Sequence, residues 1–251
     1  MKVSSLLPLL FGWAASQKAR KRGAFEIVQR YDIHQISLLK LTRYFRATDR
    51  FFADKEATPW KKLTEAYNAE MKRARGLSKT RVSLRYVSKF EDAIKAFNPN
   101  VTVPYWNYTV YHQHPKLDPI FLNYMFGAEV DSDKCLISGN FKNYKGLDGY
   151  CLKRELFMRG TSLPDPSDLD AMLSKPSLKD AIRSLRKLTL RVEKFLGGMF
   201  TRNQSIFDPL HYCIQGFNLK LLKQWSVKHK YDLTRYSREF ASVTDDIYPL
   251  S

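Results

Sequence analysis

The sequence predicts a mainly α-helical protein with long loops and a few short strands. Apolar residues recur at helical spacing up to about residue 97 and again from about residue 177. Between these two parts, Pro, Gly and aromatic residues recur without that spacing. The chain has 251 residues, of which 44% are hydrophobic, so it can bury a sizeable core. Because no repeat or long linker divides it, we expect one domain.

Two helices are expected in the first part of the chain. Thr58-Pro59-Trp60 is typical of a helix start, with Thr58 as the cap and Pro59 in the first turn. The apolar residues that follow at helical spacing are Leu63, Tyr67, Met71 and Ala74. A second helix should run from about Lys79 to Phe97, with an apolar stripe formed by Val82, Tyr86, Phe90, Ile94 and Phe97.

The rest of the chain should hold a loop region and two more helices. From Asn98 to about Asp168 the composition predicts ordered loops and short strands. A third helix should cover Ser177 to Leu196 and end at Gly197-Gly198. A fourth should follow Asp208-Pro209 and run from about Leu210 to His229.

The N-terminus has the pattern of a secretory signal peptide. Lys2 supplies a positive start, a mostly apolar run follows, and Ala14-Ala15-Ser16 offers a cleavage site. We therefore expect residues 1–16 to be removed and the protein to be secreted into the extracellular space. A buried N-terminal helix is the alternative. A basic arm over residues 17–42 would follow, and then the domain over residues 43–251.

The chain is strongly basic, with 42 Lys and Arg against 25 Asp and Glu, a net charge of +17. This excess favours polyanionic partners, such as an acidic polysaccharide or an acidic matrix protein. Nucleic acid is disfavoured because the chain has no recognition motif or zinc signature. Later stretches are too short to span a membrane. Two cationic stripes at helical spacing form the expected polyanion site: Arg81, Arg85 and Lys89, then Arg183, Lys187 and Arg191.

The chain has three cysteines. In a secreted protein, Cys135 and Cys151 could close a loop and leave Cys213 unpaired. Their spacing fits no zinc site. The sequons for N-glycosylation are at Asn100, Asn107 and Asn203.

Several motifs, in order along the chain, resemble the tyrosinases. The stretch after the first copper-binding helices of that family resembles Phe90-Glu91, Asn98-Pro99 and Val103-Pro104-Tyr105-Trp106-Asn107. The second copper region resembles Gly197-Gly198-Met199, Ser205, Asp208-Pro209 and Trp225. The connecting segments of animal, particularly mollusc-type, members resemble Phe126-Gly127, Ser138-Gly139-Asn140-Phe141 and Leu152-Lys153-Arg154. The resemblance spans roughly Arg43 to Trp225.

The resemblance implies a type-3 copper fold, in which six imidazoles project into a four-helix bundle. There they hold two copper ions that oxidise phenols to quinones. In this sequence the ligand positions fall on other residues: Tyr67, Ala74, Ser83, Thr189, Glu193 and the Ile214-Gln215 pair. Five histidines in the whole chain cannot supply six ligands. We therefore expect a pseudoenzyme with no catalytic residues, no metal site and no copper cofactor.

Three other features have competing interpretations. His112 and His114 lie in a loop and offer two ligands to a stray metal ion. His211 falls where the family has an aromatic core residue, so we expect a buried histidine with satisfied hydrogen bonds. Glu193 is expected to be a surface partner of a neighbour such as Lys194, with a site for a hard cation as the alternative.

The centre of the bundle should close into an ordinary core, because Ala74, Ser83 and Ile214 are small or apolar. The function that follows is a secreted, catalytically inactive tyrosinase-like protein with a structural or binding role in the extracellular matrix. The alternative is a copper-dependent phenol oxidase (a tyrosinase or catechol oxidase) whose ligands are misassigned here. The sequence leaves the oligomeric state open.

Overall fold

The computed structural model describes residues 29–53, 58–142, 144–145, 149, 151–157, 160–202 and 204–233. Within them the fold is mainly helical, as predicted. The α-helices are α1 (Leu38–Ala53), α2 (Thr58–Arg73), α3 (Ser78–Lys95), α4 (Pro166–Leu173), α5 (Leu178–Leu196) and α6 (Leu210–Lys228). Short 3-10 helices are η1 (Pro115–Leu117), η2 (Pro119–Phe121), η3 (Gly198–Phe200) and η4 (Ser205–Phe207). The expected signal peptide, the first part of the basic arm and the sequon at Asn203 lie outside the described residues.

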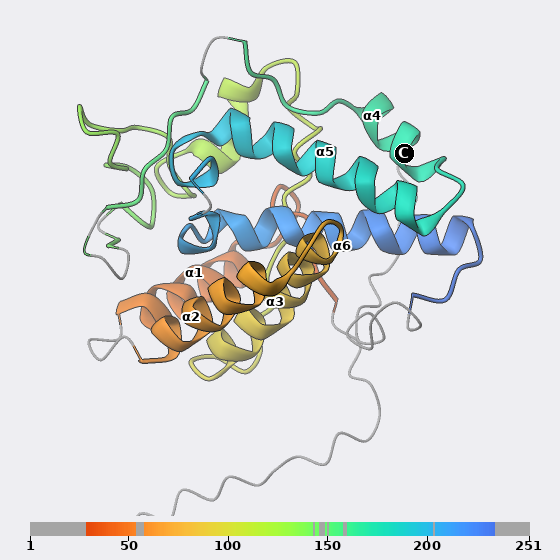
Figure 1. Ribbon diagram of the computed structural model, residues 1–251. Coiled ribbons are helices and arrows are strands. Elements are labelled where there is room, and N and C mark those ends of the chain that lie inside the picture. Colours follow the sequence, from red (N-terminus) through yellow and green to blue (C-terminus); the bar gives the residue numbers. More distant parts are fainter. Residues whose placement is uncertain are drawn as a thin grey trace, which may run out of the picture.

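The central helix is α6, which runs between α5 on one side and the α2–α3 pair on the other (Figure 1). From Leu210 to Leu222 every residue of α6 except Lys220 is buried. A helix that is buried all round must be covered by neighbours on every side, and α3, α4 and α5 supply these contacts. None of the helices in the described part of the chain is long and apolar enough to cross a membrane.

The expected helices are confirmed to within about two residues at each end, and their ends have identifiable causes. The side chain of Ser177 caps α5 by accepting a hydrogen bond from the N–H of Asp180 at 3.1 Å. At the other end Gly197 has a φ of +62°, which favours glycine and stops the helix.

Two helices and the strand expectation differ from the structure, because no separate helix was expected at α1 or at α4. The loop region expected up to Asp168 contains α4, which starts with a capping box between Asp165 and Asp168 and has Pro166 in its first turn. The short strands expected in the same region are reduced to four isolated β-bridges among the described residues. Contacts of side chains with residues far away in the sequence, rather than a sheet, hold these loops in place.

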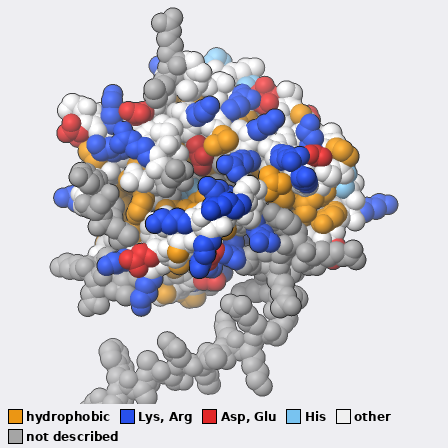
Figure 2. All heavy atoms as spheres, viewed as in Figure 1, with side chains coloured by type: hydrophobic (Ala, Val, Ile, Leu, Met, Phe, Trp, Pro, Cys, Tyr) orange, Lys and Arg blue, Asp and Glu red, His pale blue; other side chains and the backbone are white. Residues whose placement is uncertain are grey.

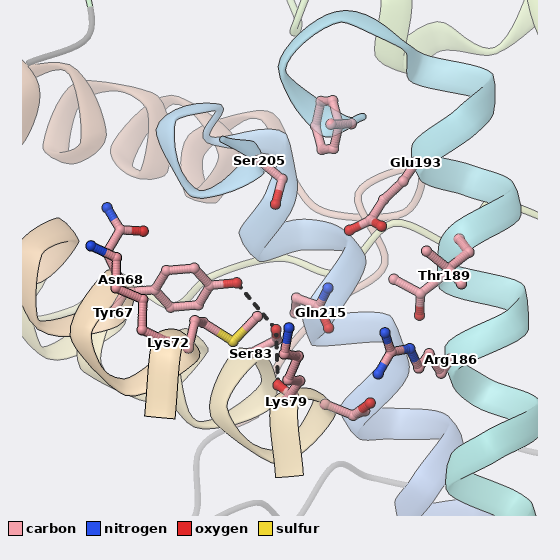
Figure 3. A pocket seen from close by; sticks show the side chains of 14 residues that line it. Tyr67, Asn68, Lys72, Lys79, Ser83, Arg186, Thr189, Glu193, Ser205 and Gln215 are labelled. Atoms are coloured by element: carbon pink, nitrogen blue, oxygen red, sulfur yellow. Dashed lines mark hydrogen bonds between the residues drawn. The ribbon is translucent and has the colours of Figure 1, made fainter. Parts of the chain in front are cut away.

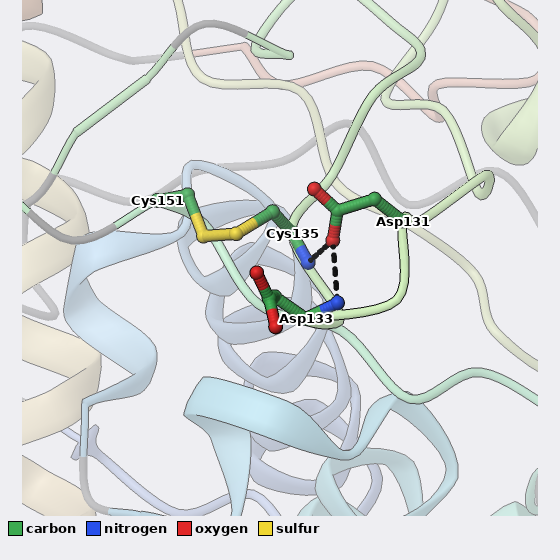
Figure 4. The surroundings of a disulfide bond; sticks show 4 residues. All are labelled: Asp131, Asp133, Cys135 and Cys151. Carbon is green, nitrogen blue, oxygen red and sulfur yellow. Dashed lines mark hydrogen bonds between the residues drawn. A yellow bond between two sulfur atoms is a disulfide. The ribbon is translucent and has the colours of Figure 1, made fainter.

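The disulfide closes the loop expected from the cysteine spacing. Cys135 and Cys151 are bonded, with their Cα atoms 5.5 Å apart, and Cys213 is free and buried on α6. Asp131 stabilises the turn before the bond, because its Oδ1 atom accepts hydrogen bonds from the N–H groups of Asp133 and Cys135, both at 2.9 Å (Figure 4). A β-bridge from Cys135 to Lys153 then joins this loop to the segment that enters the core.

The glycines of the matched motifs mark places where two backbones touch. Gly127 and Gly139 have φ values of +71° and +84°, and a side chain on either would collide with the backbone of the opposite segment. Gly198 lies in the same way against the carbonyl group of Lys153. These motifs therefore fix the packing of the loop region against the bundle.

Candidate functional site

A fully buried ion pair anchors the loop region to the start of α6. Arg154 donates two hydrogen bonds to Asp208, from Nε at 2.7 Å and from Nη2 at 2.9 Å. Its Nη1 atom donates to the carbonyl groups of Phe126 and Gly127 at 3.0 and 2.8 Å. Asp208 also accepts from the N–H of Leu210, in the first turn of α6. The motif residues at both ends of this pair are thus satisfied by each other, without a metal ion.

A second buried group connects the Tyr-Trp motif to the chain before α1. The indole N–H of Trp106 donates to Asp118 at 3.0 Å, and Nε2 of His34 bonds the other oxygen of Asp118 at 2.8 Å. Burial lowers the pKa of His34, but the hydrogen bonds and charges of Asp118 and Asp32 outweigh it and raise this pKa to about 9. His34 is therefore protonated at neutral pH and serves as a cation of the scaffold.

The Glu of the Phe-Glu motif is equally well paired. Glu91 is buried, accepts a hydrogen bond from the N–H of Val103 at 2.9 Å, and forms ion pairs with Arg30 at 3.2 Å and Lys95 at 3.3 Å. Because Val103 begins the Pro-Tyr-Trp motif, this carboxylate joins two of the tyrosinase-like motifs. We call Glu91, Trp106, Asp118, Arg154 and Asp208 the loop buttress.

The centre of the bundle is open. A cavity of about 490 Å³ lies among α2, α3, α5, α6 and the segment of η3 and η4. Five of the six positions expected to have lost a copper ligand line this central cavity, as Figure 3 shows: Tyr67, Ser83, Thr189, Glu193 and Gln215. The sixth, Ala74, follows α2 and packs half-buried against the core without lining the cavity. The structure therefore brings together the positions that were identified separately in the sequence.

The expected collapse of the bundle centre is wrong. Tyr67 and Ser83 share a hydrogen bond of 3.2 Å, and Thr189 donates to the carbonyl of Leu185 on its own helix at 2.9 Å. Asn218, a residue that the sequence did not single out, donates to Thr189 at 2.9 Å and to Oε1 of Gln215 at 3.1 Å. These bonds run along the walls of the cavity, so they hold its lining in place without drawing the helices together.

Glu193 lines the cavity and does not act as the surface partner that was expected. Its carboxyl group points inward in Figure 3, whereas Lys194 is exposed. Glu193 makes no ion pair within the described residues. Burial raises the pKa of Glu193 to about 7, against the opposing attraction of Arg186. At neutral pH this side chain is therefore a mixture of the acid and the carboxylate.

His211 is buried, as expected, but its hydrogen bonds are not satisfied. Neither Nδ1 nor Nε2 has a partner within the part of the chain that the structure describes. The ring packs edge-on against Tyr67, with 6.1 Å between the ring centroids, and against Tyr212. Burial lowers the pKa of His211 to about 4, so the imidazole is neutral. The expectation of a satisfied histidine is wrong.

The side chains in the cavity do not fit a pair of copper ions. Copper in such sites is held by imidazole, whereas these positions offer hydroxyl groups, an amide and one carboxyl group. Across the described residues, no group of three or more His, Cys, Asp or Glu is placed to hold a metal ion. In the His112–His114 loop, Nδ1 of His112 already bonds the carbonyl of Thr109 at 2.8 Å, while His114 is exposed.

The expected cationic stripes are only partly open to a partner. On α3, Arg85 and Lys89 both form ion pairs with Glu70 of α2, and Arg81 is exposed. On α5, Arg183 pairs with Asp180 and Arg191 with Asp168, whereas Lys187 is exposed and makes no ion pair within the described residues. Many Lys and Arg side chains nevertheless gather on the face that carries these helices (Figure 2).

Three basic residues at the cavity form a feature that sequence reasoning missed. Lys72, Lys79 and Arg186 come from α2, α3 and α5 and line the same cavity as Glu193. The signal was available for Arg186, because Arg186, Thr189 and Glu193 recur at three- and four-residue spacing and so share one face of α5. No pattern in the sequence connects that face to Lys72 and Lys79.

The fold and the cavity define a class: a mainly helical protein with tyrosinase-like motifs in its scaffold and without imidazole at its centre. The comparison with known proteins agrees at the level of sequence. A tyrosinase from Streptomyces lincolnensis is 25% identical over 168 residues, which cover 58% of this chain and 61% of that protein. The chain thus spans about three fifths of the length of this relative, and no family model matches it. The chain is tyrosinase-like in sequence, and the comparison supports no finer assignment.

Proposed function

We propose that the protein is a secreted, catalytically inactive relative of the tyrosinases with a binding or structural role outside the cell. The observation that carries the proposal is the central cavity. Five positions that resemble copper-ligand positions converge there, and they carry Tyr, Ser, Thr, Glu and Gln in place of His. An oxidase that activates dioxygen between two copper ions needs the imidazoles that these positions lack.

The bonding of the loop buttress supports the same proposal. Arg154 and Asp208 are bonded to each other, and the carboxylate of Glu91 is bonded to Arg30 and the N–H of Val103, so protein groups alone satisfy these two carboxylates. A metal ion that is not needed to hold the bundle together can be lost without loss of the fold. The scaffold is then free to serve a function other than oxidation.

The test of inactivity is oxygen uptake with catechol after loading with copper. We expect the protein to consume oxygen no faster than the same amount of dialysed buffer, while the Streptomyces tyrosinase, treated in parallel, is active. The alternative proposal, a phenol oxidase with misassigned ligands, requires turnover that depends on added copper. Such turnover would restore the enzyme interpretation.

The binding role rests on charge. The net charge of +17 and the exposed cations Arg81 and Lys187 favour an acidic polysaccharide or an acidic matrix protein as the partner. We expect retention on heparin that falls steeply with salt. The double variant Arg81→Gln, Lys187→Gln should elute at lower salt than the charge-matched control Lys116→Gln, Lys228→Gln. Equal elution of both double variants would show that the two cationic stripes do not form the polyanion site.

A further inference from the structure

We propose that the central cavity binds a small organic acid rich in hydroxyl groups, of the size of one or two uronic acid units. The proposal rests on the proposed function in one respect only, namely that no copper ions fill the cavity. It deepens that function by assigning a ligand class to the site that remains.

The inner wall of the cavity carries polar groups that the protein does not satisfy. Ser205 and Gln215 are 7% and 3% exposed, and both line the cavity. Gln215 accepts a bond from Asn218 with Oε1, while its Nε2 group has no partner within the described residues, and the same holds for the hydroxyl of Ser205. Figure 3 shows the Ser205 hydroxyl and the Glu193 carboxyl directed toward the same space. Donors that face the cavity without a partner among the described residues favour a ligand that supplies hydrogen-bond acceptors.

Charge selects an acid over a neutral molecule. Three basic side chains, Lys72, Lys79 and Arg186, line the cavity against the single carboxyl group of Glu193. Arg186 is held in place by a hydrogen bond from its Nη1 to the carbonyl of Gly76 at 3.1 Å. Because Glu193 is partly protonated at neutral pH, its repulsion of an anion is weakened there, and its acid form can donate a hydrogen bond.

The remaining residues that line the cavity favour a ligand that carries hydroxyl groups. The hydroxyl groups of Tyr67, Ser83 and Thr189 on three different helices already donate within the protein, so each offers a free acceptor position, which suits a molecule with hydroxyl donors on several sides. An apolar ring without such groups would exclude water from Gln215 and Ser205 and leave both without a hydrogen-bond partner. A volume of about 490 Å³ accommodates a molecule of one or two sugar rings.

The first test is isothermal titration calorimetry of the chelator-treated protein with D-glucuronate at low salt, with D-glucose as the neutral match. We expect glucuronate to bind at least about tenfold more tightly than glucose, as a charge-assisted contact predicts. Arg186→Gln and Lys79→Gln should each weaken binding of glucuronate about five- to tenfold. The control is Lys194→Gln, an exposed residue of the same helix as Arg186 that does not line the cavity, which should leave binding within about twofold.

A second variant tests whether the ligand binds inside the cavity or on the surface. Ser83→Leu adds volume to the cavity wall and should abolish binding of glucuronate, while circular dichroism and thermal unfolding verify the fold. Equal binding of glucose and glucuronate would overturn the proposal. So would an equal loss in Lys194→Gln and Arg186→Gln, unchanged binding by a folded Ser83→Leu variant, or no binding of glucuronate at all.

A further titration, with a short oligouronate, distinguishes a free sugar acid from the end of an acidic polysaccharide as the ligand. Binding of the oligomer at least as tight as that of glucuronate assigns the cavity to the end of an acidic polysaccharide, and binding of glucuronate alone assigns it to a free sugar acid. Failure here is distinct from failure of the proposed function. A protein that binds no acid and takes up no oxygen with catechol refutes the cavity proposal alone. A copper-dependent oxidase refutes the proposed function and, with it, the premise of the cavity proposal.

Discussion

The loop buttress and the central cavity differ in how fully their polar side chains are hydrogen-bonded. In the loop buttress, Arg154 makes four hydrogen bonds and Glu91 is bonded on both oxygens, although both side chains are buried. At the cavity, Glu193 has no ion pair within the described residues, and there Gln215 uses the oxygen of its amide group but not the NH2. His211, one turn before Gln215 on α6, has no partner for either ring nitrogen in the part of the chain that the structure describes.

This difference separates two kinds of motif residue in a tyrosinase-like chain. Residues that satisfy one another support the fold whether or not copper is bound, so they can remain when the ligands change. The residues at the ligand positions are only partly bonded to one another within the described residues, and they leave an open polar space. The resemblance to the tyrosinases is therefore carried by the scaffold, and the function has to be argued from the cavity.

The largest expected effect comes from breaking the loop buttress. Arg154→Met leaves the carboxylate of Asp208 buried and unpaired, so we expect a loss of about 3–5 kcal/mol in the free energy of unfolding. The measurement is urea denaturation followed by circular dichroism. The control Arg183→Met removes an exposed cation and should change stability by less than about 0.5 kcal/mol. A loss below about 1 kcal/mol in Arg154→Met would contradict the structural role of this ion pair.

Two glutamates allow a matched comparison between the regions. Glu91→Gln weakens the contacts with Arg30, Lys95 and the N–H of Val103, so we expect a loss of about 2–3 kcal/mol at pH 7. Glu193→Gln removes a carboxyl group without an ion pair and should change stability by less than about 1 kcal/mol. Equal losses in the free energy of unfolding, measured for the two variants by the same denaturation experiment, would contradict the predicted difference between the loop buttress and the cavity.

Replacement of His211 by an apolar ring should increase the stability of the protein. His211→Phe removes two unsatisfied ring nitrogens, so we expect a gain of about 1–3 kcal/mol. The pH dependence supplies an independent readout. The folded pKa of about 4 lies below the unfolded value of about 6.5, so on acidification the unfolded state binds a proton that the folded state excludes.

The free energy of unfolding of the natural protein should therefore fall as the pH decreases from about 6.5 toward 4. His211→Phe should lose this part of the slope. His114→Gln, which changes an exposed histidine, should keep it. A slope that is unchanged in His211→Phe would show that folding does not lower the pKa of His211.

The last expected effect is at the other end of the pH range. The pKa of His34 is raised to about 9, so the folded protein holds a proton that the unfolded chain releases above about pH 6.5. This contribution is fully present below pH 6.5 and is lost as the pH rises through 9. Denaturation at pH 6 and pH 9.5 should therefore differ less in His34→Gln than in the natural protein, and equal differences would exclude His34 as the source.

The sequence allowed the helices to be predicted more readily than the space between them. Ser177 and Gly197 delimit α5 through local chemistry, which a sequence displays directly. The capping box of Asp165 and Asp168 was equally local, and α4 was missed because the surrounding Pro and Gly residues favoured a loop. Cavity formation is not local. The collapse expected from the small side chains of Ala74 and Ser83 assumed that the helices could approach one another.

The same limit explains the errors at single residues. Glu193 stands beside Lys194 in the sequence, but its side chain faces the bundle because it is three and four residues from other inward positions. His211 was correctly expected to be buried, yet hydrogen-bond satisfaction depends on neighbours from other helices. Asn218 supplies a partner for Gln215 from the same helix, three residues further on, but only the packing of α5 against α6 shows its bond to Thr189.

The most direct test of the central claim is the copper content of the purified protein after copper loading and dialysis, measured by elemental analysis. The replacement of imidazole by hydroxyl, amide and carboxyl groups around the cavity predicts less than about 0.1 copper ion per chain. Retention of about two copper ions per chain would contradict the account, because it would require ligands that the cavity does not provide.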